Sequence, residues 1–154
     1  MADAFMSDFA ARAIAERLFF GYRAFTGDAD RVLASRGLGR AHHRALYFIE
    51  RAGSIPVHEL LATLGITKQA LTRVLRELMD AQLVERRRDP TDGRRGILTL
   101  TETGRALELS LLHAQRARIE IALAQAGPIG REAIHTFLEA LMEPEDRDRI
   151  GLSL

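Results

Sequence analysis

Hydrophobic residues recur at helical spacing along most of this chain, and the spacing changes to that of strands near residue 83. Between residues 57 and 64 they follow the i, i+3, i+4, i+7 template of an amphipathic helix. Gly65 favours a tight turn after this helix, and Thr67 is a suitable N-cap for a second helix reaching Asp80. This arrangement predicts a helix-turn-helix unit. The residues expected to point inward from the second helix are Ala70, Leu71, Val74, Leu75 and Leu78.

The stretch from Leu83 to Thr101 predicts a β-hairpin. Residues 83–88 form a short strand in this interpretation, and residues 97–101 form the returning strand. Between them, Asp-Pro-Thr-Asp-Gly at 89–93 is dense in turn-forming residues. Arginines flank this turn on both sides, so the hairpin has a cationic tip.

The rest of the chain is helical in pattern. Thr26-Gly27-Asp28 is a plausible break, although one helix could run through it. Gly53-Ser54-Ile55-Pro56 predicts a short extended piece, because the residue before proline avoids helical conformation. Gly127-Pro128 should end a long helix whose two apolar stripes suggest burial on two sides. The further segments expected are helices at 8–26, from the break to Arg36, at 40–51, from Thr101 to about 126 and at 131–142, and an acidic tail from Pro144 to Leu154.

Composition narrows the class of protein. The 154 residues include no cysteine, which excludes disulfides, thiolate metal ligands and cysteine nucleophiles. No apolar run approaches the roughly 18 residues of a membrane span, and no signal-peptide pattern is present, so we expect a cytoplasmic protein without membrane contact. The net charge is only +1, but residues 67–101 carry 8 basic and 5 acidic side chains, whereas residues 102–154 carry 6 and 9. Positive charge is therefore concentrated in the middle of the chain.

The order of helices, helix-turn-helix, hairpin and long C-terminal helices resembles the MarR (multiple antibiotic resistance regulator) family over nearly the whole chain. Two departures are an Ala81-Gln82 pair where the family usually has a glycine, and the break near Gly27. The motifs that carry the resemblance are Gly37-Leu38, Val57-x-Glu59-Leu60-Leu61-x-x-Leu64-Gly65, Thr72-Arg73-Val74-Leu75-Arg76-Glu77-Leu78, Leu83-Val84-Glu85-Arg86, Asp89-Pro90-x-Asp92-x-Arg94 and Leu100-Thr101-x-x-Gly104.

The resemblance implies a mainly α fold with a small β-wing, in a single domain spanning 1–154. Within it, residues 37–101 would form a winged helix-turn-helix with its wing at about 83–101. Residues 1–36 and 102–154 would supply the dimerisation helices. The implied function is a homodimeric, sequence-specific DNA-binding transcriptional regulator, more often a repressor, with a palindromic operator.

The second helix of the helix-turn-helix has the residues needed to read a major groove. Lys68, Gln69, Thr72 and Arg73 lie near its N-terminus on polar positions, where glutamine suits adenine and arginine or lysine suits guanine. Thr67 and Arg76 are better placed for phosphates. The candidate DNA-binding residues in the wing are Arg86, Arg88, Asp92, Arg94 and Arg95.

Within the wing, the resemblance implies that Arg94 enters the minor groove, whose negative potential attracts arginine. Asp92 is expected to brace an arginine and shape the turn. Structural alternatives remain for the cations on both elements. Arg86-Arg87-Arg88 could be a solvated strand edge. Arg73 and Arg76 could pair with Glu77 or Asp80, and Thr67 caps its helix whether or not DNA is present.

Aromatic and histidine side chains suggest a ligand pocket between the dimer helices and the winged domain. The candidate lining residues are Phe19, Tyr22, Phe25, His42 and His43, and a small aromatic or amphipathic ligand bound there would change the spacing of the recognition helices. Ordinary core packing is the alternative for each residue.

Other chemistries lack support in the sequence. The histidine spacing fits no metal site. No nucleophile elbow or glycine-rich phosphate loop is present, so we predict no enzyme activity, cofactor or metal. The competing functional class is a winged-helix protein-interaction module that does not bind DNA.

Overall fold

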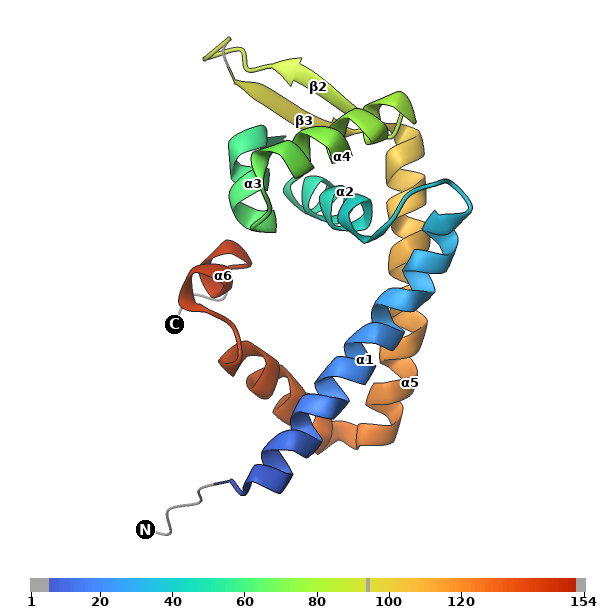
Figure 1. Ribbon diagram of the computed structural model, residues 1–154, viewed down its shortest axis with the longest axis vertical. Helices are drawn as coiled ribbons and strands as arrows, with labels where there is room; N and C mark the ends of the chain where they lie inside the picture. Colours follow the sequence, from blue (N-terminus) through green and yellow to red (C-terminus); the bar gives the residue numbers. More distant parts are fainter. Residues whose placement is uncertain (1–5, 94, 152–154) are drawn as a thin grey trace.

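The computed structural model describes residues 6–93 and 95–151 as a mainly helical chain with one small antiparallel sheet (Figure 1). The predicted fold class, mainly α with a β-wing, is confirmed. The elements in chain order are α1 (Asp8–Ala34), α2 (Arg40–Ala52), β1 (Ile55–Pro56), α3 (Val57–Leu64), α4 (Lys68–Asp80), β2 (Val84–Arg88), β3 (Gly96–Leu100), α5 (Glu102–Ala140) and α6 (Pro144–Arg149).

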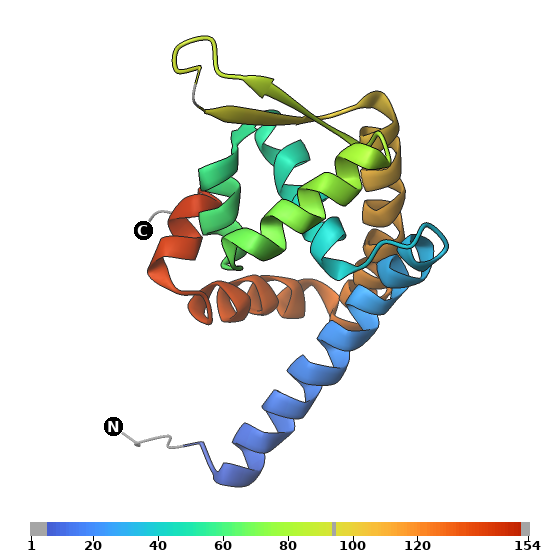
Figure 2. The ribbon, with the colours of Figure 1, turned by 45° about the horizontal axis from the view of Figure 1, so that its top comes forward.

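Two long helices extend from a body formed by α2, α3, α4 and the sheet (Figure 1, Figure 2). α1 packs against α5, and α5 also packs against α2 within the body. Beyond Gly127 the second part of α5 turns back toward α3, and the N-terminal end of α1 projects away from the rest. In the part of the chain that the structure describes, no helix is long and apolar enough to cross a membrane.

The helix-turn-helix forms as its local sequence requires. Gly65 ends α3 in the left-handed conformation, at φ 61°, which glycine adopts without a side-chain clash. The Thr67 hydroxyl then accepts a hydrogen bond from the Ala70 N–H at 3.2 Å and caps α4. Leu71 and Leu78 are buried, as predicted. Ala70, predicted to point inward, is instead exposed, because it lies in the first turn of α4 beside the polar residues that face solvent.

The sheet has the strand order β1–β3–β2, and all its pairs are antiparallel. Val84 is opposite Leu100 and Arg86 is opposite Leu98 in the β2–β3 register. Val84, Leu98 and Leu100 are buried against the helices. The far end of the hairpin continues past this core, so its arginines are exposed while the near end anchors the strands.

α1 runs without interruption, so the break expected at Thr26-Gly27-Asp28, with a separate short helix to Arg36, is wrong. Thr26 is buried and its hydroxyl donates to the Tyr22 carbonyl at 2.9 Å, which satisfies it inside the helix. Asp28 is held by Arg118 of α5 rather than by its own backbone. Thr26 therefore bonds within its own helix and Asp28 bonds to another helix, so neither residue interrupts α1.

The break expected at Gly127-Pro128 is confirmed. Gly127 has φ 71° and ψ −179° inside α5, a conformation that interrupts the helix and redirects the chain. Of the two apolar stripes expected before this kink, only part of one is covered. Leu107 and Leu111 are buried, whereas Leu109 and Ile119 remain exposed.

The C-terminal segment contains a short helix where an acidic tail was expected. α6 is attached to the body by two arginine contacts with backbone carbonyls: Arg149 donates to Ala62 at 3.1 Å, and Arg51 donates to Ile150 at 2.9 Å. Leu152 and Leu154, predicted as the apolar end of the tail, lie outside the described residues. The tail therefore contacts α2 and α3 of its own chain.

Candidate nucleic-acid interface

The exposed face of α4 carries five polar side chains around a shallow hollow of about 320 Å³. Leu71, Val74 and Leu78 bury the opposite face, so the amphipathic pattern fixes which side of the helix meets solvent. All the residues predicted to contact DNA from this helix lie together on the exposed side. They are Lys68, Gln69, Thr72, Arg73 and Arg76.

The N-terminal turn of α4 favours a negatively charged partner. The unpaired N–H groups of a helix start give it a partial positive charge, and Lys68 adds a full charge there. Thr67 is exposed although its hydroxyl oxygen caps the helix. The Thr72 hydroxyl donates to the Lys68 carbonyl at 2.8 Å, which leaves its oxygen free only to accept. Thr72 is thus suited to a base amino group rather than to a phosphate.

Arg73 is paired on the helix surface, as the structural alternative anticipated. Its Nε donates to Glu77 at 3.0 Å, and the other Glu77 oxygen lies 2.6 Å from His42 Nε2. The bond from Arg73 lowers the pKa of Glu77, and the bond from His42 lowers it further, so this carboxylate is ionised near neutral pH. His42 therefore faces α4, and its predicted place in the ligand pocket is wrong. No local pattern signals this contact, since 35 residues separate the partners.

Arginines of β2, together with Arg95 just before β3, surround a second hollow of about 420 Å³ at the far end of the hairpin. Arg86 folds across β3: a Cβ at Gly96 would lie 2.2 Å from its Nε and would displace this guanidinium. Arg87, by contrast, is paired with Glu85 at 2.9 Å. Arg88 and Arg95 complete the cluster. The cationic tip expected from sequence is therefore present on the exposed end of the hairpin.

The turn between the strands is organised by its two aspartates. Asp89 accepts from the Thr91 N–H at 2.8 Å and from its hydroxyl at 2.7 Å, and these bonds lower the pKa of Asp89. Asp92 forms an ion pair with Arg95, whose Nε lies 3.2 Å from one carboxylate oxygen, as the bracing role expected of this aspartate requires. Arg94, the predicted minor-groove residue, lies outside the described residues.

Three of the five predicted ligand-pocket residues line one cavity of about 420 Å³ between α1, α2 and α5. These are Tyr22, Phe25 and His43, together with Tyr47, Phe48 and Leu112. Phe19 is not among the lining residues. It is 63% exposed on α1, where its ring packs edge-on against Phe20.

Burial and neighbouring charges set the character of this cavity. Burial lowers the pKa of His43, and the opposing effect of the Asp30 carboxylate does not reverse it, so the imidazole is neutral near pH 7. Arg44 donates to the Tyr22 hydroxyl at 2.5 Å, and Arg40 donates to Asp30 at 2.7 Å. The walls are thus largely apolar and aromatic, with a cationic rim.

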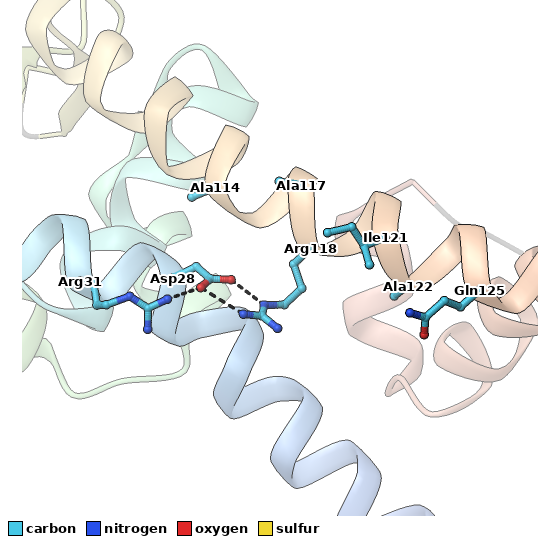
Figure 3. A pocket seen from close by; sticks show the side chains of 8 residues that line it. All are labelled: Asp28, Arg31, Ala114, Ala117, Arg118, Ile121, Ala122 and Gln125. Atoms are coloured by element: carbon cyan, nitrogen blue, oxygen red, sulfur yellow. Dashed lines mark hydrogen bonds and ion pairs between the residues drawn. The ribbon is translucent and has the colours of Figure 1, made fainter.

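A larger cavity of about 620 Å³ opens between α1 and α5, away from α4 (Figure 3). Arg118 donates to Asp28 through Nε at 2.5 Å and Nη2 at 3.1 Å, and Arg31 also pairs with this carboxylate. The bonds from Arg118 lower the pKa of Asp28. Because Asp28 is held by two arginines of its own chain and ties α1 to α5, we assign this region to helix packing rather than to ligand binding.

Comparisons with known proteins agree with this geometry. The MarR family model matches residues 36–95, which run from the end of α1 to the wing. A relative from Rhodobacter capsulatus, the HTH-type transcriptional regulator PetP, is 46% identical over 143 residues, covering 93% of this chain and 86% of that protein.

Solved structures with the same fold include two MarR-type proteins. A cysteine-to-serine mutant of MarR from E. coli, complexed with operator DNA, matches with a TM-score of 0.66 at 22% identity, over 89% of this chain and 99% of that one. A MarR-family transcriptional regulator from Silicibacter pomeroyi matches with a TM-score of 0.70 at 22% identity, over 90% and 92%. At these identities the structural matches establish the fold.

Proposed function

This chain belongs to the MarR family of transcriptional regulators, and on that premise we propose that it is a homodimeric repressor that binds a palindromic DNA operator. The observation that carries this proposal is the placement of two cationic elements at one end of the molecule. α4 packs against β2, and the helix and the β2–β3 hairpin lie at the same end of the molecule (Figure 1), so the polar face of α4 and the arginine-rich end of the hairpin belong to that end. An α-helix fits the major groove, and a neighbouring hairpin can reach the adjacent minor groove.

Each element has a distinct task in this proposal. Lys68, Gln69 and Arg73 read base edges from the N-terminal half of α4, while Thr67 and Arg76 contact phosphates. Arg86, Arg88 and Arg95 bind the backbone from the wing. Asp92 supports this arrangement by orienting Arg95, not by facing DNA. We retain Arg94 as the groove-inserting residue because it directly precedes Arg95 in the sequence.

The exposed apolar side chains of α1 and α5 support the homodimer. Large hydrophobic side chains exposed together usually mark an interaction surface. A second copy of this chain is the partner we propose, since both helices would then bury their uncovered stripes. The side chains concerned include Phe9, Phe19, Ile121, Ile129, Phe137, Leu138 and Leu141.

We expect the wing arginines to contribute to DNA affinity through phosphate contacts. Each phosphate neutralised by a cation adds about 0.9 to the slope of log affinity against log salt concentration. Replacing Arg86 and Arg88 together by glutamine should therefore reduce that slope by about 1.8 and weaken binding to any duplex. Fluorescence anisotropy between about 50 and 200 mM salt measures both quantities.

Arg87→Gln is the matched control for this pair. Arg87 lines the same hollow as Arg86 and Arg88, but its guanidinium is already paired with Glu85 and is therefore less available to a phosphate. We expect its slope to stay within about 0.5 of the native value. If the Arg86/Arg88 variant keeps the native slope, the wing does not bind the backbone.

We also propose that a small aromatic or amphipathic ligand occupies the cavity lined by Tyr22, Phe25 and His43 and releases the protein from DNA. The aromatic walls and neutral imidazole suit such a ligand, and the cavity lies between α1 and α5 on one side and α2 on the other. A bound molecule could thus alter the angle between the dimer helices and the body that carries α4. A modest rotation would prevent both recognition helices from engaging one face of the duplex.

A thermal-shift screen with small aromatic acids and amphipathic compounds tests this ligand. Leu112→Trp should fill the cavity and abolish the shift given by any compound that binds the native protein. Leu109→Trp is the control, because Leu109 is an exposed leucine of the same helix that does not line the cavity. A screen without a shift, and with DNA binding unchanged by every compound, would indicate a ligand-independent regulator.

A further inference from the structure

His42 and Glu77 connect the start of α2 to the exposed face of α4. The Gly39 N–H donates to His42 Nδ1 at 3.0 Å, and His42 Nε2 lies 2.6 Å from one Glu77 oxygen. The second Glu77 oxygen accepts from Arg73 Nε at 3.0 Å. One continuous series of hydrogen bonds therefore runs from the backbone ahead of α2 to a guanidinium on the candidate DNA-binding face.

The direction of these bonds follows from the donors available. A backbone N–H can only donate, so Nδ1 of His42 acts as the acceptor and the ring proton is on Nε2. Nε2 then donates to Glu77, whose two oxygens are used for two different partners. The His42 side chain is only 11% exposed, against 34% for Glu77 and 73% for Arg73. His42 is therefore held inside the protein at one end of the series, whereas the Arg73 guanidinium at the other end is accessible to DNA.

The contact with Glu77 leaves the two terminal nitrogens of Arg73 available for DNA. Only Nε is bound to Glu77, and among the described residues no acceptor takes a hydrogen bond from its terminal nitrogens. Those two nitrogens can form the paired bonds that guanine accepts through O6 and N7. An arginine already held in one orientation loses less conformational freedom when it binds. Arg76, on the same face, has no hydrogen-bond acceptor among the described residues, so it lacks this constraint.

We propose that Glu77 and His42 are positioning residues for DNA recognition, holding the guanidinium of Arg73 in the orientation that reads one base pair of each half-site. The proposal rests on the proposed DNA-binding function. It assigns Glu77 a supporting role even though its negative charge would by itself repel DNA. It also assigns His42 to the DNA-binding surface, although sequence placed it in the ligand pocket.

A double-mutant cycle tests this coupling with a fluorescein-labelled duplex obtained by selection with the native protein. Arg73→Ala alone should weaken binding about tenfold. Glu77→Gln keeps the side-chain size but replaces one of the two acceptor oxygens with an NH2 donor and removes the charge, and it should weaken binding about threefold to tenfold. In the Glu77→Gln background, Arg73→Ala should weaken binding less than about threefold, because the Arg73 guanidinium is then no longer held in its base-reading orientation.

Arg76→Ala is the matched control, since it removes a cation from the same face without touching the series. Arg76→Ala should weaken DNA binding by the same factor in the native protein and in the Glu77→Gln background. A second readout is base preference: selection with the Glu77→Gln protein should relax the same operator position as selection with Arg73→Ala. His42→Ala should relax it too, with thermal unfolding used to verify that each variant is folded.

Two results would overturn the proposal while leaving DNA binding intact. One is an equal cost of Arg73→Ala in both backgrounds. The other is tighter binding by Glu77→Gln, which would mean that the carboxylate withholds Arg73 from DNA. If the native protein binds no duplex, the proposed function itself fails, and this assignment fails with it.

Discussion

Replacing Phe137 by aspartate is expected to separate the dimer into monomers, raising its dissociation constant by at least about 100-fold. Phe137 is 41% exposed on the part of α5 beyond Gly127, and Leu138 and Leu141 are exposed beside it. Aromatic anchors at interface centres commonly cost about 2–4 kcal/mol when lost, and a two-fold dimer contains the substitution twice. A carboxylate also resists removal from water unless it is paired. Sedimentation velocity over a concentration series measures the dissociation constant.

The same change should weaken DNA binding, because two linked half-site contacts give an affinity about 10²–10⁴ times that of either alone. Thr136→Asp is the matched control: it adds the same charge to the neighbouring exposed, polar position of the helix. We expect this control to remain dimeric. A Phe137→Asp protein that is still dimeric at nanomolar concentration would show that this part of α5 lies outside the interface.

Gly104→Ala should destabilise the folded protein by about 3 kcal/mol, although alanine is normally the better helix former. Gly104 lies in the first turn of α5, and a Cβ there would approach the Leu83 carbonyl oxygen to 2.0 Å. That oxygen already accepts from the Thr101 N–H at 3.1 Å, so it cannot move without breaking the junction between the wing and α5. The expected fall in Tm is about 6–12 °C by calorimetry.

Gly27→Ala provides the matched control within α1. Among the described residues its new methyl group would meet only Arg31, at an ordinary distance of 3.8 Å, so the higher helix propensity of alanine should raise stability by about 0.5–1 kcal/mol. The same change from glycine to alanine is therefore expected to destabilise the protein at position 104 and to stabilise it at position 27. If Gly104→Ala melts at or above the native temperature, the close approach of α5 to Leu83 is not a constraint in solution.

The elements of the helix-turn-helix and wing could be predicted because their signals are local. Gly65 and Thr67 act within one turn of their own positions, and the Asp89 side chain organises residues two positions ahead. The same holds for the kink at Gly127. The exposed polar face of α4 followed directly from its apolar spacing, since burial of Leu71 and Leu78 leaves only one side for the cations.

Predictions from the sequence were wrong where contacts between residues far apart in the chain determine the local structure. Thr26-Gly27-Asp28 has the composition of a break, but burial of Thr26 and the bond between Asp28 and Arg118 keep α1 continuous. His42 and His43 are adjacent on one helix and therefore point in different directions, but the sequence did not show which of them faces the cavity. In the structure His43 lines the cavity, while His42 faces Glu77.

The most direct test of the account is selection of duplexes from random DNA by the native protein, with the stoichiometry of the bound complex measured. We predict an enriched inverted repeat whose half-sites are centred about 10–10.5 base pairs apart, or a multiple of that spacing, occupied by two protein chains. Enrichment of no sequence, or a complex containing a single chain, would contradict the proposal that paired α4 helices and wings recognise an operator.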